Sequence, residues 1–229
     1  LIKTGVGTLT LSGANTYTGA TAVNAGKLVT STDSTGAGAY SVATGAGLGV
    51  NVLAANAQLN QSSLTLGAST LDVDLGSFGN PTAAPLNVTG ALAVDGAVTV
   101  NIATALPQLG QVPLIAYGSR TGAGSFVIGS LPSGVVATIV TNGNVIALNV
   151  SAVAAPRWDG QVNGVWDIGT TANWIELSTS AAANYADGNA VLFNDSASGT
   201  TSVTLGVTVS PAKVTVNNTN LSYSISGGG

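Results

Sequence analysis

The chain opens with short alternating runs that are separated by turn residues at close intervals. Leu9 and Leu11 alternate with hydroxyl residues, which places the two leucines on one face of a strand. Residues 13–15 interrupt this run with residue types that tolerate positive φ, and the alternation restarts at Thr16–Thr18 and again at Thr21–Val23. Strands this short bury too little surface to be stable alone, so each needs a stacked neighbour. The stretch therefore predicts a unit of a parallel β-solenoid.

The composition of the chain favours an all-β fold with a neutral surface. Only 6% of the residues are charged, whereas charged residues make up roughly 25% of an ordinary globular protein. Glycine is abundant, at 31 of 229 residues. Small β-forming residues combined with turn residues, and so few Lys, Glu and Arg, argue against helices.

The charges and the missing residue types exclude several classes of protein. The net charge is −4 and the five basic residues form no patch, so we expect no nucleic-acid partner. No run of about 18 apolar residues occurs, and no basic segment precedes an apolar one at the start. We therefore expect neither a transmembrane segment nor a remaining signal peptide. Since the sequence contains no Met, we expect a processed product, a fragment or one unit of a longer chain.

Residues 7–28 read G-T-L-T-L-S-G-A-N-T-Y-T-G-A-T-A-V-N-A-G-K-L. This stretch closely resembles the autotransporter-associated β-strand repeat of bacteria, whose pattern is roughly G-T-L-T-L-S-G-x-N-x-Y-x-G-x-T-x-V-x-x-G-x-L. The resemblance implies a β-solenoid in a giant surface or extracellular repeat protein, and hence an extracellular or cell-surface location in a bacterium. The positions that carry it include Leu9, Leu11, Gly13, Asn15, Tyr17, Gly19, Val23, Gly26 and Leu28.

Residues 1–155 keep this pattern of short alternating runs separated by turn residues and are expected to form the solenoid. Asp72 and Asp74 alternate with apolar residues, so we expect both carboxylates to face solvent. Residues 108–150 are interpreted as consecutive antiparallel strands that close the solenoid, with hairpin turns at residues 122–124 and 141–143. This closing segment also resembles the last portion of repeat units in the same large surface proteins.

Residues 154–156 read Ala-Ala-Pro and form the best boundary, so residues 156–229 are expected to be a Trp-rich β module that leads into the next repeat. We expect this module to be rich in antiparallel strands, with one tryptophan on each strand of successive hairpins. Its aromatic residues are the candidates for a structural core: Trp158, Trp166, Trp174, Tyr185 and Phe193.

The two ends of the sequence reproduce a junction when they are written tail to head. In the resembling family, a Trp-rich module leads through Y-x-x-S-G-x-G into L-x-K-x-G-x-G-T-L-T-L-S-G. Residues 223–229 followed by residues 1–13 give the same order of residue types. The resemblance therefore implies that this chain is one period of a head-to-tail array. Its expected partner is another copy of itself, either as a separate subunit or as the next repeat of one polypeptide.

The sequence offers little that could support catalysis. With no His and no Cys, Ser–His–Asp and Cys–His catalysis and metal sites that use those ligands are excluded. Asp72 and Asp74, with Arg120 distant in sequence, do not make the acidic groove with a basic residue that a polysaccharide lyase needs. We expect structural roles for the acids of the Trp-rich module, which are Asp159, Asp167, Glu176, Asp187 and Asp195. No enzyme activity, catalytic residue or cofactor is expected.

Two ligand classes stay open as alternatives. Asp187, Asn189 and Asp195 offer oxygen ligands for Ca²⁺, but their spacing matches neither an EF-hand nor a nonapeptide repeat, so no metal site is predicted. The three tryptophans would bind carbohydrate if they were exposed and coplanar, whereas as core residues they would fill the module, which is the favoured interpretation. The function expected is an extracellular structural unit of a surface fibre, filament or adhesin stalk; the alternative is a carbohydrate-binding or lyase-like β-helix module that contacts surface glycans.

Overall fold

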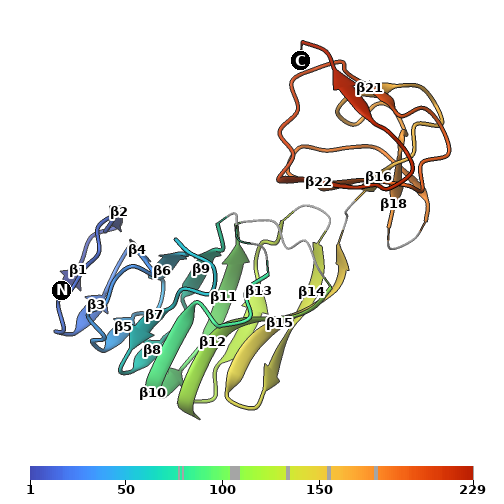
Figure 1. The fold of residues 1–229 in the computed structure, drawn as a ribbon. Helices are drawn as coiled ribbons and strands as arrows, with labels where there is room; N and C mark the ends of the chain where they lie inside the picture. The colour runs from blue at the N-terminus through green and yellow to red at the C-terminus, as the bar shows by residue number, and fades with distance from the viewer. Residues whose placement is uncertain are drawn as a thin grey trace. The chain divides into compact units, whose positions relative to one another are not determined.

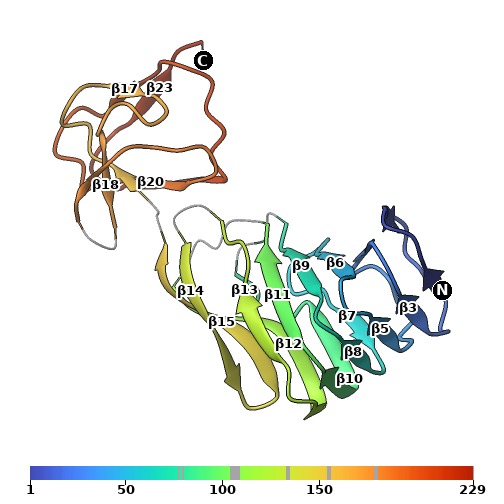
Figure 2. The same cartoon turned by 180° about the vertical axis from the view of Figure 1, so that it is seen from behind.

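The computed structural model describes residues 1–76, 78, 80–103, 109–132, 135–153, 156–177 and 180–228. The regular secondary structure of these residues consists of β-strands, and none of the described residues lies in a helix. This confirms the all-β prediction. Most of the strand pairs are parallel. Such an arrangement is compatible with a β-solenoid (Figures 1 and 2).

The chain divides into two compact units. The first consists of Leu1–Thr104, Gln108–Leu131 and Ala137–Ser151. The second consists of Ala152–Gly229 together with Ala105–Pro107 and Pro132–Val136. Ala154 and Ala155, where the sequence places the domain boundary, lie outside the described residues, as does Gln108 at the start of the predicted closing strands.

Two sheets build the first unit, and the chain visits them alternately. The first sheet holds, in order, β1 (Ile2–Lys3), β3 (Thr21–Val23), β5 (Tyr40–Val42), β8 (Leu64–Leu66), β10 (Leu86–Val94) and β12 (Gly110–Thr121), with β7 (Leu59–Gln61) also pairing with β10. The second sheet holds β2 (Thr8–Thr10), β4 (Lys27–Ser31), β6 (Gly47–Asn51), β9 (Thr70–Asp74), β11 (Ala97–Ile102) and β13 (Ser125–Ile128). Because each strand pairs in parallel with one from the next turn of the chain, the turns stack in sequence order.

The register of the second sheet places like residues above one another. Leu28 pairs with Leu48, Leu48 with Leu71, and Leu71 with Val100, and all four side chains are buried. Because side chains alternate between the two faces of a strand, the residues that follow each of these form a row on the outer face. This outer row consists of Val29, Gly49, Asp72 and Asn101. Asp72 and Asp74 therefore lie on the outer face, as the alternation predicts.

Glycines occupy the corner where the chain passes from the first sheet to the second. A Cβ atom on Gly96 would lie 2.6 Å from the backbone nitrogen of Ala68, and a Cβ on Gly124 would lie 2.6 Å from that of Gly96. The backbones of successive turns approach too closely here for any side chain. Residues 122–124 are thus a corner of the stack, and the prediction of a hairpin turn there is wrong: β13 pairs in parallel with β11 instead of folding back on β12.

A hairpin closes the first sheet after β12. β14 (Val135–Asn142) and β15 (Val145–Val153) are sheet neighbours joined by two residues, Gly143 and Asn144, and Gly143 has φ +55°. A two-residue connection of this kind joins antiparallel strands. β15 also pairs antiparallel with β12, so the parallel order of the first sheet ends at this point.

The second unit is also built mainly from parallel pairs. Its larger sheet has the order β19 (Ala182–Ala183), β18 (Trp174–Glu176), β16 (Pro156–Trp158), β20 (Ala190–Asn194) and β22 (Lys213–Asn217); its smaller sheet has β17 (Val165–Trp166), β21 (Ser202–Leu205) and β23 (Ser224–Ser226). Among the described strands of this unit, only the β16–β18 and β18–β19 pairs are antiparallel. The prediction of an antiparallel-rich module is therefore wrong, because the chain again alternates between two sheets and stacks β20 on β16 and β21 on β17.

Two alternating runs of the sequence differ from the strands that form. Residues 16–18 have no regular structure, because this return segment contacts the next turn through isolated bonds, such as those from the Thr35 and Gly36 N–H groups to the Asn15 carbonyl. A second alternating run begins at Tyr185 in the sequence, but the strand there starts only at Ala190. The expected series of hairpin strands with one tryptophan each also fails, since β17 lies in a different sheet from β16 and β18.

Candidate functional site

The residues of the repeat motif divide between core and corner positions. Val23 and Leu28 are fully buried in the two sheets, and Leu9 and Leu11 are partly buried near the start of the stack. Asn15 donates from Nδ2 to the Gly13 carbonyl at 2.7 Å, and the Tyr17 hydroxyl bonds to Thr21 at 2.9 Å. Gly26 has φ +66°, whereas Gly13 and Gly19 have open space where a side chain would start.

Lys3 ties the first two turns of the chain together. Its ammonium group is buried and donates to the carbonyls of Thr4, Gly5 and Ala25 at 3.1, 2.7 and 3.0 Å. Three carbonyl acceptors satisfy all three protons of the ammonium group. The side chain is therefore a structural cation within the stack.

The five aromatic residues predicted as core form one buried cluster in the second unit. Trp158, Trp174, Tyr185 and Phe193 are fully buried, and Trp166 is 2% exposed. Their rings meet mostly edge to face; the centroids of Trp166 and Trp174 lie 5.1 Å apart, and those of Trp166 and Tyr185 lie 5.2 Å apart. Because these rings are buried, they offer no flat exposed surface on which a sugar could stack.

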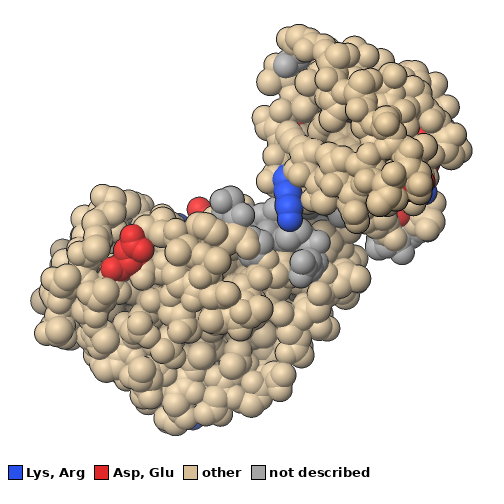
Figure 3. Space-filling view, in the orientation of Figure 1, with Lys and Arg blue, Asp and Glu red and all other residues tan. Residues whose placement is uncertain are grey.

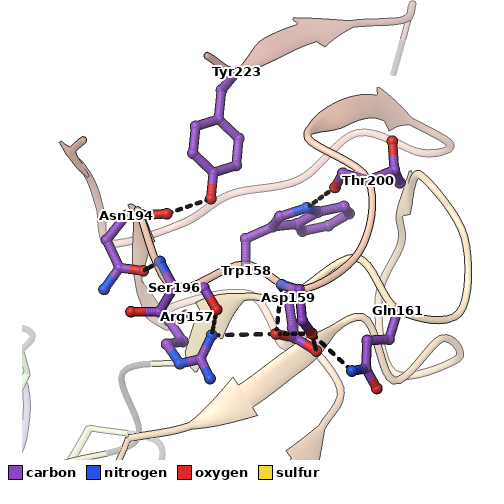
Figure 4. A network of polar contacts seen from close by, with 9 residues as sticks. Arg157, Trp158, Asp159, Gln161, Asn194, Ser196, Thr200 and Tyr223 are labelled. Carbon is purple, nitrogen blue, oxygen red and sulfur yellow. Dashed lines mark hydrogen bonds and ion pairs between the residues drawn. The ribbon is translucent and has the colours of Figure 1, made fainter. Parts of the chain in front are cut away.

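Asp159 lies in a polar network beside this cluster (Figure 4). Its carboxylate accepts hydrogen bonds from the backbone N–H and hydroxyl of Ser198, and it pairs with the Arg157 guanidinium at 3.2 Å. The guanidinium also donates to the Ser196 carbonyl at 2.7 Å, and the Trp158 indole donates to the Thr200 carbonyl at 2.7 Å. Ser196, Ser198 and Thr200 lie on the connection between β20 and β21, so the network fixes that connection to β16 and to the residue that follows it.

Asp167 and Asn173 bond to the chain segments near Trp166 and Trp174. Asp167 accepts from the backbone N–H of Thr171 at 2.9 Å, and Glu176 lies at the end of β18. Asn173 is fully buried and makes four bonds: Oδ1 accepts from the N–H groups of Val162 and Asn163, while Nδ2 donates to Asn163 and Val165. Structural roles were expected from the sequence for the acids of this module, whereas Asn173 was not among the predicted residues.

The three residues considered for Ca²⁺ do not come together. Asp187 accepts from the Tyr185 hydroxyl and the Ser210 N–H, and Asn189 accepts from the Ala186 N–H within the turn that precedes β20. Asp195 lies on a different connection and accepts from the N–H groups of Thr219, Asn220 and Leu221 and from the Thr219 hydroxyl. No group of three or more His, Cys, Asp or Glu residues suited to a metal occurs among the described residues.

Two of these groups have shifted pKa values. The pKa of Asp195 is lowered well below its ordinary value by the Leu221 N–H group, followed by the Thr219 hydroxyl and the other N–H donors. Burial raises the pKa of Tyr185 above its ordinary value, and its bond to Asp187 raises it further. The hydrogen bonds of the folded chain favour the charged carboxylate of Asp195, whereas burial and the bond to Asp187 favour the neutral hydroxyl of Tyr185. Both shifts therefore reflect bonds that hold turns in place.

Charged residues distant in sequence meet on the outer face of the second sheet. Lys27 on β4 forms an ion pair with Asp72 on β9, and Asn101 on β11 donates to the other oxygen of Asp72 at 2.7 Å. The cation beside Asp72 is Lys27, because β6 alone separates β4 from β9 in the sheet. Figure 3 shows one face of the molecule, on which charged side chains are few.

The final turn of the second unit leaves its inner face uncovered. Val214 pairs with buried Val191, and Val216 pairs with buried Phe193. Both valines therefore continue the rows of inward-facing core residues onto the last strand. They are nevertheless 44% and 55% exposed, and Ile225, which pairs with buried Val203, is 45% exposed. β22 and β23 are the last strands of their sheets, so no further strand covers these side chains in the described residues.

The first turn of the first unit is open in the same way. β1 and β2 are the outermost strands of the first and second sheets. Leu1 and Ile2 are exposed, the latter at 71%, and Val6 in the corner between the strands is also exposed. Lys3 is the cation of this turn and is already satisfied by carbonyls. Each of these two turns, β22 with β23 and β1 with β2, therefore presents apolar side chains and a strand edge that no described strand pairs.

Comparison with protein families places a known repeat on this first turn and on part of the second. Residues 1–29 match the passenger-associated-transport-repeat. The segment from β1 to the middle of β4 is thus similar to a repeat of autotransporter passengers, which agrees with the resemblance carried by residues 7–28 and suggests a surface or extracellular location. Comparisons with curated proteins and with solved structures gave no match. Among the described residues, no helix has the length and apolar character needed to cross a membrane.

Proposed function

We propose that this chain is a structural β-solenoid unit of a bacterial surface protein and that it extends head to tail. In this proposal the turn formed by β22 and β23 stacks on the turn formed by β1 and β2 of the next unit. The observation that carries it is the exposure of Val214, Val216 and Ile225, which lie in register with buried core residues. Each of these side chains occupies a core position that lacks its next layer.

The physical driving force is the burial of these side chains and the pairing of strand edges. An unpaired edge offers a row of N–H and C=O groups to another strand unless charge, proline or a covering segment protects it. β2 and β23 contain no charged residue, and Lys213 is the single charge on β22. Stacking would cover apolar surface at about 25 cal/mol per Å² and would satisfy the edge groups at the same time.

The contact joins two different surfaces, so it propagates. A heterologous contact of this kind forms a ring only if its rotation closes, and otherwise it builds an open filament. The same geometry serves consecutive repeats of one polypeptide and separate copies of the unit. The passenger-repeat match over residues 1–29 supports an extracellular or cell-surface stalk, filament or adhesin as its setting. The proposal assigns no enzymatic reaction to the unit.

Charge placed on the open face tests the proposal. Val216→Lys puts an ammonium group on the inner row of β22, whereas the control Thr215→Lys puts the same group on the outer face of the same strand. We expect the unmodified chain to form larger species with rising concentration in sedimentation velocity and filaments in electron micrographs. Val216→Lys should weaken this association at least about tenfold, and Thr215→Lys should leave it nearly unchanged.

A covalent pair of units provides a second test that does not depend on concentration. In a fusion of Gly229 to Leu1 of a second copy, the amides of β1 in the second copy should exchange with solvent far more slowly than β1 of the single unit. A chain that stays monomeric at millimolar concentration and a fusion whose β1 amides exchange as fast as in the single unit would together overturn the proposal. Equal effects of the two lysine variants would overturn the proposed contact surface.

A further inference from the structure

We propose that the outer face of the second sheet binds a neutral saccharide chain in a groove that crosses β4, β6, β9 and β11. The groove has a volume of about 420 Å³. Its polar lining residues are Lys27, Asn51, Asp72, Asp74, Asn101 and Ser130. This site is independent of the open ends of the stack, so it can be tested whether or not the units associate.

The groove exists because β6 presents glycines on its outer face. Leu48 and Val50 point into the core, so Gly47 and Gly49 alternate with them on the outside. The neighbouring strands carry full side chains at the paired positions, Lys27 and Val29 on β4 and Thr70 and Asp72 on β9. Gly49 lines the groove, whereas the Thr70 hydroxyl and the Lys27 stem lie over Gly47 where a side chain would stand.

The Lys27 side chain lies along this groove and is held at both ends. A Cβ atom on Gly49 would lie 3.3 Å from Cε of Lys27, so the lysine stem rests on the glycine backbone. Its ammonium group pairs with one oxygen of Asp72, and the Nδ2 of Asn101 donates to the other. The ion pair keeps part of its surface open to solvent, with exposed side-chain fractions of 35% for Lys27 and 27% for Asp72.

The polar groups are fixed before any ligand arrives. Oδ1 of Asn101 accepts from the backbone N–H of Ser130 at 2.8 Å and from its hydroxyl at 3.0 Å. The Asp74 carboxylate accepts from the Gly76 N–H at 3.0 Å, and Asn51 pairs with Asp74 in the register of the sheet. Groups held on adjacent strands are spaced by about 4.8 Å. Such preorganisation lowers the entropic cost of binding.

The chemistry of the lining selects the ligand class. Two carboxylates face one ammonium group, so the groove has an excess of negative charge that disfavours phosphates and acidic polysaccharides. A cation would find only two carboxylates here, and one of them is already paired with Lys27. Carboxylates, amides and an ammonium group together offer both acceptors and donors, and each sugar hydroxyl both donates and accepts. A neutral saccharide matches this set.

The test compares two asparagines that make the same kind of bond on opposite sheets. Asn101 bonds to Asp72 in the groove, while Asn87 donates to Asn60 at 2.8 Å on the outer face of the first sheet. The probes are neutral hexasaccharides of glucose, mannose and galactose, with a hexagalacturonate and CaCl₂ as separate arms, measured by titration calorimetry on the 229-residue chain. Asn101→Ala should weaken binding of a neutral hexasaccharide about tenfold, and Asn87→Ala should change it less than about twofold.

A second variant fills the groove without removing a hydrogen bond. Gly49→Ala is compatible with a strand, and its methyl group would crowd Val29 and the Lys27 stem. We expect it to keep the far-ultraviolet spectrum and unfolding temperature of the parent and to lose saccharide affinity. Absence of neutral saccharide binding at millimolar concentration, equal loss in the Asn101 and Asn87 variants, or tighter binding of hexagalacturonate or Ca²⁺ would each overturn the assignment.

Discussion

Trp158 and Trp174 form one residue pair of the antiparallel strands β16 and β18, and their rings meet edge to face with centroids 5.1 Å apart. Trp174 also contacts the rings of Trp166, Tyr185 and Phe193. It is thus one of the rings that join the two sheets of the second unit in one core, as Phe193 does through its contact with Trp166. The aspartates of this unit (Asp159, Asp167, Asp187 and Asp195) lie in turns and connections, whereas Arg157, Glu176 and Lys213 lie on strands.

The central position of Trp174 predicts a large loss of stability when its ring is removed. Trp174→Ala should lower the free energy of unfolding of the second unit by about 3–5 kcal/mol, because a fully buried ring leaves a cavity that its neighbours fill only in part. Ile175→Ala on the same strand removes a half-buried side chain from the opposite face and should cost about 1 kcal/mol. Denaturant titration monitored by tryptophan fluorescence measures both, and similar losses in the two variants would contradict the assignment of this core.

Alternation along the sequence anticipated strands such as β9 and their inner faces. Leu71 and Val73 point inward and Asp72 and Asp74 outward because a strand has a period of two. Alternation says nothing, however, about which strand lies beside which. The ion pair of Lys27 with Asp72 depends on the stacking of three successive turns, so it could be found only once the register was known.

The same limitation explains the errors in strand direction. The local conformational preferences of a glycine-rich segment such as residues 122–124 are compatible with a hairpin turn and with a solenoid corner alike. What distinguishes them is the backbone of the previous turn, since a Cβ on Gly122 would collide with the Val94 carbonyl. Close approach between turns is a property of the stack. A useful sequence signal would have been the recurrence of glycine at the same place in each turn.

Two glycines of the repeat motif are predicted to differ sharply in their tolerance of a side chain. Gly26 has φ +66°, and a Cβ there would lie 2.5 Å from the Gly5 carbonyl oxygen and closer still to that of Gly7. Gly26→Ala should therefore destabilise the first unit by at least about 2 kcal/mol. Gly13→Ala meets open space and should change stability by less than about 0.5 kcal/mol. Thermal unfolding of the two variants checks this, and an equal effect would show that the motif glycines share one role.

Asn173 is predicted to be specific for an amide side chain. Asn173→Asp keeps the size of the residue but replaces the donor that bonds to Asn163 Oδ1 at 2.8 Å and the Val165 carbonyl at 2.7 Å with an acceptor. Two hydrogen-bond acceptors that face each other in a fully buried site should lower the free energy of unfolding by at least about 3 kcal/mol. Asn184→Asp removes an exposed bond to the Gly169 carbonyl and should cost less than about 1 kcal/mol. Chemical denaturation at pH 7 compares the two, and a tolerated Asn173→Asp would contradict this account.

The lowered pKa of Asp195 predicts that the turn between β22 and β23 weakens in acid. Its carboxylate accepts from Leu221 and Asn220 through Oδ1 and from Thr219 through Oδ2, and these donors favour the charged form in the folded state. Since the folded pKa lies below the unfolded value of about 3.9, the stabilisation is complete above that value and is lost as the pH falls below it. The open turn proposed for stacking should therefore loosen first at low pH.

Variants at this turn separate the carboxylate from its individual donors. Asp195→Asn should lower the unfolding temperature of the second unit at pH 7, and the difference from the parent should shrink as the pH falls below about 4. Thr219→Val removes the hydroxyl donor but keeps the three N–H donors, so it should retain most of the pH dependence of the parent. Calorimetric scans between pH 7 and pH 2 measure all three chains. A difference between Asp195→Asn and the parent that stays constant over this range would show that the carboxylate charge does not hold the turn.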